Sequence, residues 1–433
     1  MKTKNKLSDI LMILVVVIFV TSCGSDDTNT ADPVEENKPP ETFNLIAVAD
    51  NEKNVAVRPT FSWEPANDPD RDALTYDIYL TDQIALLDHR NLSPYALYKE
   101  NLNTVTFKAT ERLELSKDYY WRVIAKDEKG SSSASAIRSF STRDLKLPND
   151  PIIASAQFSE RRDFTSVVFN DKIWVIGGRN DNLENVNDVW YSENGENWTE
   201  ATTNAQFSAR RGHTSIVFDS KIWIIGGYDN NSQYLNDVWY SADGINWTEA
   251  SASAQFSGRR NHTSVVFNDK MWVIGGDRGA SRFNDVWQSE DGVAWNQVTA
   301  SAQFSSRNNH TVVVFDDKLW VIGGHDGNNY KNDVWQSEDG VVWNQVATGS
   351  LFNERVGHTS VIFDDKIWVV GGVAPGGLFN DIWYTSSGNV WKQVKNNVSF
   401  SKRYYHTSIV FKEKIWLIAG YDGSFLNDVW ALE

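Results

Sequence analysis

One phrase occurs six times in the second part of this chain and limits the fold more than any other feature. KIWVIGG begins at residue 172, and near copies follow at 221, 270, 318, 366 and 414, the last reading KIWLIAG. An arginine precedes every copy at the same distance, so the arginines recur every 48 or 49 residues. A fixed period of this length indicates a propeller or a solenoid, because a single unit cannot bury its own faces.

Each unit contains four short pieces that predict four β-strands. In the second unit, which starts at Arg210, they read HTSIVF, KIWIIGG, NDVWYS and NWTEA. The unbroken apolar run of the second piece is typical of a strand buried on both faces. The pair Asp243-Gly244 separates the third and fourth pieces and favours a type I′ hairpin, in which both central residues need positive φ. No helical period is present, so six such units predict a six-bladed β-propeller.

The repeated pattern resembles kelch repeats, including the central domain of galactose-oxidase-like proteins. It consists of Arg-x-x-His, an apolar strand, Trp-x-x-Gly-Gly, a variable loop, Asn-Asp-x-Trp, a turn and Trp. The resemblance implies a six-bladed kelch-type propeller over residues 144–433. Galactose-oxidase chemistry needs copper and a Tyr–Cys crosslink, but the single cysteine of the chain is Cys23. We therefore expect no such oxidation, no metal and no cofactor.

The sixth unit ends at Glu433, before its turn and fourth strand. A ring with an open seam would expose a strand edge. We expect residues 147–154 to supply the missing strand, with Ile152 in the register that Ala201 and Ala250 have in their own units. Asn149 stands where the other fourth strands have tryptophan.

Residues 42–143 contain short alternating runs, such as LTYDIYL and YYWRVIAKD, which predict strands. This segment resembles a fibronectin type III domain through Trp63, Trp121 and Tyr119, with Leu113 six residues before that tyrosine. The resemblance implies a β-sandwich in which Tyr119 is the corner tyrosine. The predicted fold class is thus all-β: a fibronectin type III-like β-sandwich followed by the six-bladed kelch-type propeller.

A run of alternating carboxylates, Asp68, Asp70 and Asp72, lies between two predicted strands of this sandwich. Carboxylate oxygens in such a loop could hold Ca²⁺. No glycine or distal glutamate completes a known calcium loop, so a solvated acidic turn is the alternative.

The first 22 residues carry lysines at positions 2, 4 and 6 and then an apolar run from Leu11 to Val20. This is typical of a signal peptide and too short for a membrane span. The sequence Val20-Thr-Ser-Cys23-Gly resembles a bacterial lipobox, which implies lipidation of Cys23. Residues 23–41 predict a flexible tether. The acidic residues after the cysteine resemble an export signal, so we expect an outer-membrane lipoprotein that faces the cell exterior.

The net charge of −16 argues against nucleic acid as a partner. We expect a monomer that contacts the membrane through its lipid alone.

Two repeated residue types could mark a site near one mouth of the propeller. The six arginines could bind an anion, although one aspartate per unit makes a structural Arg–Asp pair the stronger interpretation; they are Arg161, Arg210, Arg259, Arg307, Arg355 and Arg403. Five histidines also recur, with Phe164 in place of the first. Because they belong to the repeat, we predict a structural role for them rather than a metal site.

Function should lie where the units differ, because the ring explains what they share. The most variable segment follows Gly-Gly, and its aromatic and polar residues suit a glycan or a protein surface. The candidate ligand-binding residues are Tyr228, Arg278, His325, Tyr330 and Tyr421. No acid–base pair outside the repeat is evident, so we predict no catalytic residue and a non-catalytic binding module for a glycan or a protein. The alternative is a carbohydrate-active enzyme, such as the sugar epimerases and mutarotases built on kelch propellers.

Overall fold

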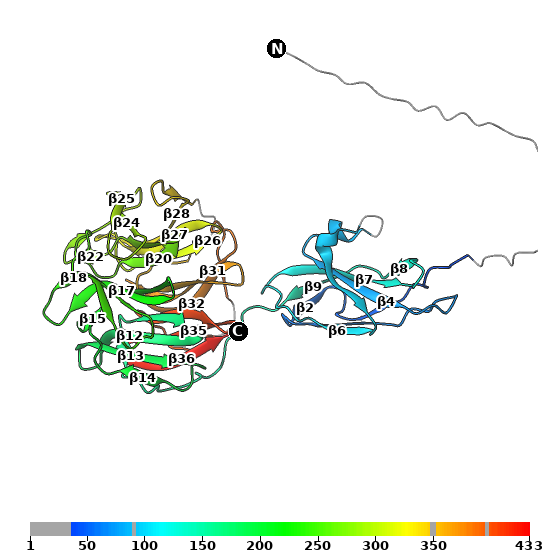
Figure 1. Cartoon of the computed structure of the whole chain (residues 1–433), viewed down its shortest axis with the longest axis horizontal. Coiled ribbons are helices and arrows are strands. Elements are labelled where there is room, and N and C mark those ends of the chain that lie inside the picture. Colours follow the sequence, from blue (N-terminus) through cyan, green and yellow to red (C-terminus); the bar gives the residue numbers. More distant parts are fainter. Residues whose placement is uncertain (1–35, 89–91, 347–351, 395–397) are drawn as a thin grey trace, which may run out of the picture.

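The computed structural model describes residues 36–88, 92–346, 352–394 and 398–433, and Figure 1 shows two bodies joined end to end. The predicted signal peptide, Cys23 and most of the predicted tether lie outside the described residues. Two short 3₁₀ turns, η1 (Ile84–Leu87) and η3 (Pro94–Ala96), interrupt what is otherwise strand and loop in the described part. No helix there has the length and apolar character needed to cross a membrane.

The first body is a β-sandwich with two facing sheets. Its strands are β1 (Leu45–Ala47), β2 (Glu52–Val55), β3 (Thr60–Trp63), β4 (Thr75–Thr81), β5 (Leu97–Leu102), β6 (Thr106–Lys108), β7 (Asp118–Lys126), β8 (Ser132–Ala134) and β9 (Arg138–Thr142). One sheet has the order β1-β3-β6, and the other has the order β2-β9-β7-β4-β5, with β8 on β7. Trp63 and Trp121 lie in the core between the sheets. The hydroxyl of Tyr119 accepts the backbone N–H of Glu114, as a corner tyrosine does.

The second body is built from six small antiparallel blades. Blades one and two contain β10 (Arg161–Arg162), β11 (Thr165–Phe169), β12 (Lys172–Asn180), β13 (Asn185–Ser192), β14 (Thr199–Thr202), β15 (Arg210–Arg211), β16 (Thr214–Phe218), β17 (Lys221–Asp229), β18 (Tyr234–Ser241) and β19 (Thr248–Ser251). Blades three and four contain β20 (Thr263–Phe267), β21 (Lys270–Ile274), β22 (Asp277–Arg278), β23 (Ser281–Arg282), β24 (Val286–Ser289), β25 (Asn296–Thr299), β26 (Thr311–Phe315), β27 (Lys318–His325), β28 (Tyr330–Ser337) and β29 (Asn344–Gln345). Blades five and six contain β30 (Thr359–Phe363), β31 (Lys366–Ala374), β32 (Gly377–Thr385), β33 (Lys392–Gln393), β34 (Thr407–Phe411), β35 (Lys414–Tyr421) and β36 (Phe425–Leu432).

The innermost strand of each blade contacts the innermost strand of the next, and β34 of the last blade contacts β11 of the first. The six blades therefore close a ring, which Figure 1 shows with the red last strands beside the green first blade. The second strand of each blade is buried on both faces, as its apolar run predicts.

The predicted position of the type I′ turn is wrong. Both central residues have positive φ in the two-residue turn between the first and second strands, for example Asp219 and Ser220. In the turn at Asp243-Gly244, only the glycine has positive φ. The aspartate there accepts backbone N–H groups within its own loop, and a Cβ on Gly244 would lie 2.2 Å from the ring of Trp174 in the neighbouring blade. This glycine is needed for packing between blades rather than for a hairpin.

The closure of the sixth blade is confirmed. The segment before blade one runs beside β36: Ile153 pairs with Val429, as Thr202 pairs with Val189 inside blade one. This places Ile152 in the register of Ala201, as the sequence predicts. In addition, β10 joins β36, so the first and last blades share one sheet.

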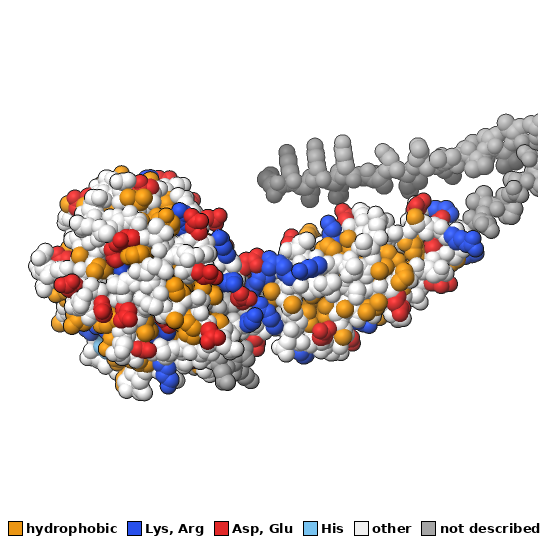
Figure 2. All heavy atoms as spheres, turned by 90° about the horizontal axis from the view of Figure 1, so that it is seen from below, with side chains coloured by type: hydrophobic (Ala, Val, Ile, Leu, Met, Phe, Trp, Pro, Cys, Tyr) orange, Lys and Arg blue, Asp and Glu red, His pale blue; other side chains and the backbone are white. Residues whose placement is uncertain are grey.

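The sandwich packs directly on blades five and six. Val57, Leu115 and Leu145 are buried in the same apolar cluster as residues of those blades. Arg112 and the backbone N–H of Leu115 both bond the carboxylate of Asp364. Figure 2 shows basic and acidic side chains meeting at this junction.

Candidate functional site at the mouth of the propeller

The six repeated arginines are the centres of structural clamps. Arg307, with no exposed surface, uses all five of its N–H donors: two bond Asp333, one bonds the Gly323 carbonyl, and two bond the carbonyl and hydroxyl of Ser305. The same aspartate also accepts the indole N–H of Trp335. The other five arginines make the equivalent bidentate pairs, with Asp188, Asp237, Asp285, Asp381 and Asp428. These buried guanidiniums are engaged with protein, so the structure supports the paired role of the arginines rather than the anion-binding one.

The five repeated histidines line the central channel behind the mouth. They are buried, and in four blade junctions their Nε2 lies within hydrogen-bond distance of a threonine hydroxyl of the preceding blade, as for His406 and Thr359 at 3.1 Å. Burial, with a smaller effect of the adjacent arginine, lowers the pKa of His406 to about 3. The pKa values of the other four are lowered for the same reasons. The histidines are thus neutral packing groups.

A ring of six residues, each two positions after a clamp arginine, surrounds the mouth itself. We call it the mouth ring; it consists of Asp163, Gly212, Asn261, Asn309, Gly357 and Tyr405. Each backbone N–H donates to the carbonyl of the member in the preceding blade, and the bond from Asp163 to Tyr405 closes the belt, at N–O distances of 2.8 to 3.3 Å. All six residues have positive φ. Asparagine, aspartate and glycine tolerate this region, whereas Tyr405 at φ 55 is an unusual residue for it.

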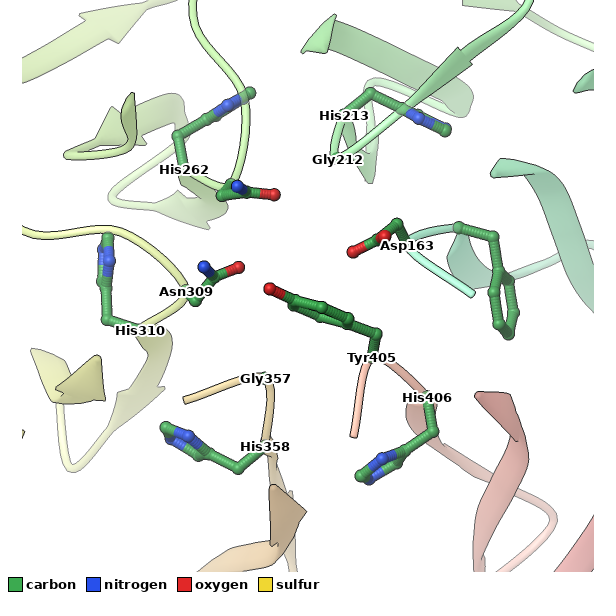
Figure 3. A pocket seen from close by; sticks show the side chains of 12 residues that line it. Asp163, Gly212, His213, His262, Asn309, His310, Gly357, His358, Tyr405 and His406 are labelled. Carbon is green, nitrogen blue, oxygen red and sulfur yellow. The ribbon is translucent and has the colours of Figure 1, made fainter. Parts of the chain in front are cut away.

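The mouth ring encloses a hollow of about 170 Å³. Figure 3 shows the carboxylate of Asp163, the amide of Asn309 and the hydroxyl of Tyr405 pointing toward its centre, while the histidines lie further out. Unlike the clamps and the histidines, these groups differ from blade to blade. The hollow is therefore asymmetric, with four residue types around its six sides.

A second ring, one position nearer each clamp arginine, gives the mouth an electrostatic polarity. It carries arginine in blades one to three, at Arg162, Arg211 and Arg260, which we call the arginine arc. Blades four to six have the uncharged residues Asn308, Val356 and Tyr404 at this position. The side chains of the arginine arc are partly buried beside the mouth. Arg162 lies 3.8 Å from the carboxylate of Asp163, and Arg260 lies 3.2 Å from that of Asp277, whereas Arg211 has no carboxylate within 4.0 Å among the described residues. Arg211 therefore gives this side of the mouth an excess of positive charge, and the other side is neutral and aromatic.

Two of the predicted loop residues lie against the arginine arc. The ring of Tyr228 has the guanidinium carbons of Arg211 and Arg260 at 5.1 Å from its centre. The ring of Tyr421 lies 4.5 Å from the guanidinium of Arg162 and also contacts Tyr404. Both tyrosines hold arginine side chains in place beside the hollow.

The other three predicted loop residues are not part of this group. The Nδ1 atom of His325 accepts a bond from Arg282 and another from the backbone of Gly327, and its ring packs edge-on against Tyr330. Burial, assisted by Arg282, lowers the pKa of His325. Arg278 is exposed at the end of β22 in blade three.

Two groups of the mouth ring have pKa values moved by burial. Burial raises the pKa of the Asp163 carboxyl, although Arg162, Arg211 and Arg260 act in the opposite direction. Burial, with a further contribution from Asp163, also raises the pKa of the Tyr405 hydroxyl. A carboxyl group and a hydroxyl group that differ from the repeat thus share one hollow, and the absence of catalytic residues stays a prediction.

The sequence analysis did not predict the mouth ring, because it placed the candidate site in the variable loops after Gly-Gly and not in the segments after the clamp arginines. The signal is present in the alignment on the clamp arginines. The second residue after each arginine reads Asp, Gly, Asn, Asn, Gly and Tyr, although it lies between an invariant arginine and a histidine that recurs in five blades.

The ring closure, the six clamps and the mouth define a kelch-type β-propeller with one asymmetric hollow at its axis. The chain belongs to the kelch-repeat family: residues 163–348 and 291–433 match the KLHDC2/KLHL20/DRC7 Kelch-repeats domain. The match begins after the sandwich, whose likeness to fibronectin type III stays a prediction.

Among solved structures, the chain is similar to the one titled "Structure of YjhT", with a TM-score of 0.54 and 16% identity. The likeness covers 64% of this chain and 96% of that one, and at this identity it shows the fold alone. No curated protein sequence matches the chain.

Proposed function

We propose that the protein is a non-catalytic binding module that holds a glycan with an acidic group at the mouth of its propeller. The observation that carries this proposal is the mouth ring, which breaks the sixfold repeat at the axis while the clamps around it do not vary. The proposal includes an anchor: lipid at Cys23, a tether and the sandwich would carry the propeller on the outside of the outer membrane.

The chemistry of the mouth suits a sugar better than a flat protein surface. Amide and hydroxyl groups such as those of Asn261, Asn309 and Tyr405 can both donate to and accept from sugar hydroxyls. The partly buried rings of Tyr404 and Tyr421 at the edge of the mouth are aromatic groups against which a sugar ring could pack. The arginine arc would pair with a carboxylate or a sulfate, because guanidinium groups bind such anions in bidentate fashion.

A glycan array containing matched acidic and neutral glycans tests this proposal. We expect acidic glycans to bind, and Arg211→Gln and Tyr405→Phe to weaken their binding by at least about tenfold, since each change removes a polar contact. Lys221→Gln is the matched control, because Lys221 lies at the opposite end of β17 and pairs with exposed Asp219. Absence of any glycan binding would refute the glycan hypothesis and favour a protein partner. The same conclusion would follow if Arg211→Gln and Tyr405→Phe bound glycans as tightly as the parent chain.

The second candidate function is a sugar epimerase or mutarotase, and one observation favours it. Asp163 and Tyr405 place two proton-transfer groups in the same hollow, and burial raises the pKa of the carboxyl toward the range useful for a general acid. A turnover assay on sialic acids and other sugars separates the two functions. If the protein is an enzyme, the parent chain turns the sugar over, and Asp163→Asn abolishes turnover but still binds the sugar. If it is a binding module, neither the parent chain nor the variant shows turnover.

A further inference from the structure

Three carboxylates from two separate loops of the sandwich converge at the end opposite the propeller. Asp68 and Asp72 belong to the loop between β3 and β4, and Asp127 follows β7. One oxygen of each carboxylate lies within 4.8 Å of the others. A single cation at the centre of such a triangle could contact all three.

The burial of these groups is the first argument for a cation. Asp68 and Asp127 are each 7% exposed. Carboxylates are almost never buried this deeply unless they are paired, and neighbouring carboxylates repel each other. Among the described residues, neither of these two forms an ion pair with a lysine or arginine within 4.0 Å.

An unpartnered oxygen is the second argument, and it is independent of the clustering. Oδ1 of Asp68 accepts the backbone N–H groups of Asp70 and Asp72, at 2.9 and 3.1 Å. Its Oδ2 is buried and has no hydrogen-bond partner among the described residues. A buried acceptor without a partner is costly, and a bound cation would remove that cost.

Lys129 and Lys38 are the cations that the chain itself places nearby, and neither replaces a bound metal. The Nζ of Lys129 lies 3.0 Å from Oδ2 of Asp72, but its side chain is 55% exposed and can turn away. Lys38 approaches Asp70 rather than Asp68, and its side chain is 67% exposed. Oδ2 of Asp68 therefore stays without a partner.

A fourth oxygen comes from the segment before the sandwich. The amide nitrogen of Asn37 donates to Oδ2 of Asp127 at 2.9 Å and to the hydroxyl of Ser131 at 2.8 Å, whereas its Oδ1 is buried and has no hydrogen-bond partner among the described residues. A half-turn of this amide would exchange the two atoms and direct Oδ1 toward the carboxylates. The ligand set would then consist of three carboxylates and one amide oxygen, with water completing the shell.

We propose that this cluster is a Ca²⁺ site, which links the β3–β4 loop, the β7–β8 hairpin and the segment at Asn37. All four donors are hard oxygen ligands, and side chains from three separate segments suit the variable geometry that Ca²⁺ accepts better than the strict octahedron of Mg²⁺. The bound ion would fix the point at which the chain enters the sandwich. The site is independent of the mouth of the propeller. Refuting the Ca²⁺ site would therefore leave the proposed glycan site unaffected, and the reverse also holds.

Calorimetric titration of the chelator-treated full chain with CaCl₂ tests the site. We expect one Ca²⁺ per chain with a Kd on the order of 0.1–1 mM, in the range of metal sites outside the high-affinity calcium sensors. Asp68→Asn retains the Oδ1 acceptor of the turn and removes the charge, and Asp72→Asn is a second variant in case the first does not fold. Each should weaken Ca²⁺ binding by at least about tenfold.

Asp118→Asn is the matched control, because Asp118 is an exposed carboxylate of the same sandwich with 74% of its side chain accessible. Its Ca²⁺ binding should equal that of the parent chain. The proposal is overturned if the parent binds no Ca²⁺ at ten times the expected Kd, or if Asp68→Asn and Asp72→Asn bind as tightly as the control. Equal affinity for MgCl₂ would overturn the assignment to Ca²⁺.

Discussion

Replacing Arg307 by methionine tests whether the buried clamps hold the propeller together. Methionine keeps an apolar stem but removes the guanidinium, which lies over the ring of Phe304 and donates five hydrogen bonds. Asp333, whose side chain is 20% exposed, would keep only the indole of Trp335 as a side-chain partner. Removing one partner of a buried ion pair costs about 3–5 kcal/mol, because the other charge is left without compensation. We expect the free energy of unfolding to fall by this amount at pH 7.

The pH dependence of this loss has a definite sign. In the parent chain the pKa of Asp333 is lowered: burial raises it, but the hydrogen bonds and charge of Arg307 lower it more. The pair therefore stabilises the fold at neutral pH, and this contribution is lost as pH falls through the lowered pKa. In Arg307→Met the burial remains and the arginine does not, so the pKa of Asp333 should rise above its usual value. Mild acid then neutralises the uncompensated carboxylate, and the difference from the parent should narrow between pH 7 and pH 5.

Urea unfolding followed by tryptophan fluorescence at several pH values measures both effects. Arg278→Met is the control, because Arg278 is exposed and its replacement should change stability by less than about 0.5 kcal/mol. Arg307→Met/Asp333→Asn should be less destabilised than the single variant, since no buried charge is left. A loss below about 1 kcal/mol at pH 7, or a loss that grows in acid, would refute the clamp argument.

Two further predictions concern the ring. Deleting residues 144–154 removes the strand that pairs with Val429, so the melting temperature measured by calorimetry should fall sharply; an unchanged melt would show that the closure is not needed. The five channel histidines should remain neutral in the folded protein, because burial lowers the pKa of His213, His310 and His406 to about 3 and that of the other two well below its usual value. Their stabilising contribution is present above the unfolded pKa of about 6.5 and is lost as pH falls below it, at up to about 1.4 kcal/mol per histidine per pH unit. Histidine NMR signals from the channel that titrate between pH 5 and 7 would contradict this prediction.

The repeat made most of the fold predictable from sequence. Identical spacing of apolar strands, clamp residues and glycines leaves few arrangements that bury all six units, and even the register at Ile152 follows from counting. The turn assignment failed for a physical reason. The same Asp-Gly pair suits a type I′ hairpin and a longer loop in which the aspartate binds backbone N–H groups, and the sequence does not show that Trp174 presses against Gly244.

The candidate site was predicted less well, because variability along the sequence does not show which variable residues lie at the propeller axis. Tyr228 and Tyr421 lie beside the mouth, but they support arginines that the sequence did not single out.

One junction between blades shows how local changes are matched in three dimensions. In five junctions the first glycine of Gly-Gly faces a histidine of the next blade; at the sixth, Ala419 replaces the glycine and Phe164 replaces the histidine, and both are buried in one cluster.

The closed backbone belt explains how the mouth can differ from blade to blade without loss of the ring. Its six hydrogen bonds involve only main-chain atoms. The side chain at each position can therefore change without breaking the hydrogen bonds that close the ring. Positive φ at all six positions favours glycine or asparagine, and four of the six residues are of these types. Tyrosine in this conformation costs on the order of 1–2 kcal/mol. The hydroxyl of Tyr405 points into the hollow. We propose that this backbone cost persists because the hydroxyl would contact a ligand at the axis, since selection for stability alone would favour glycine or asparagine here.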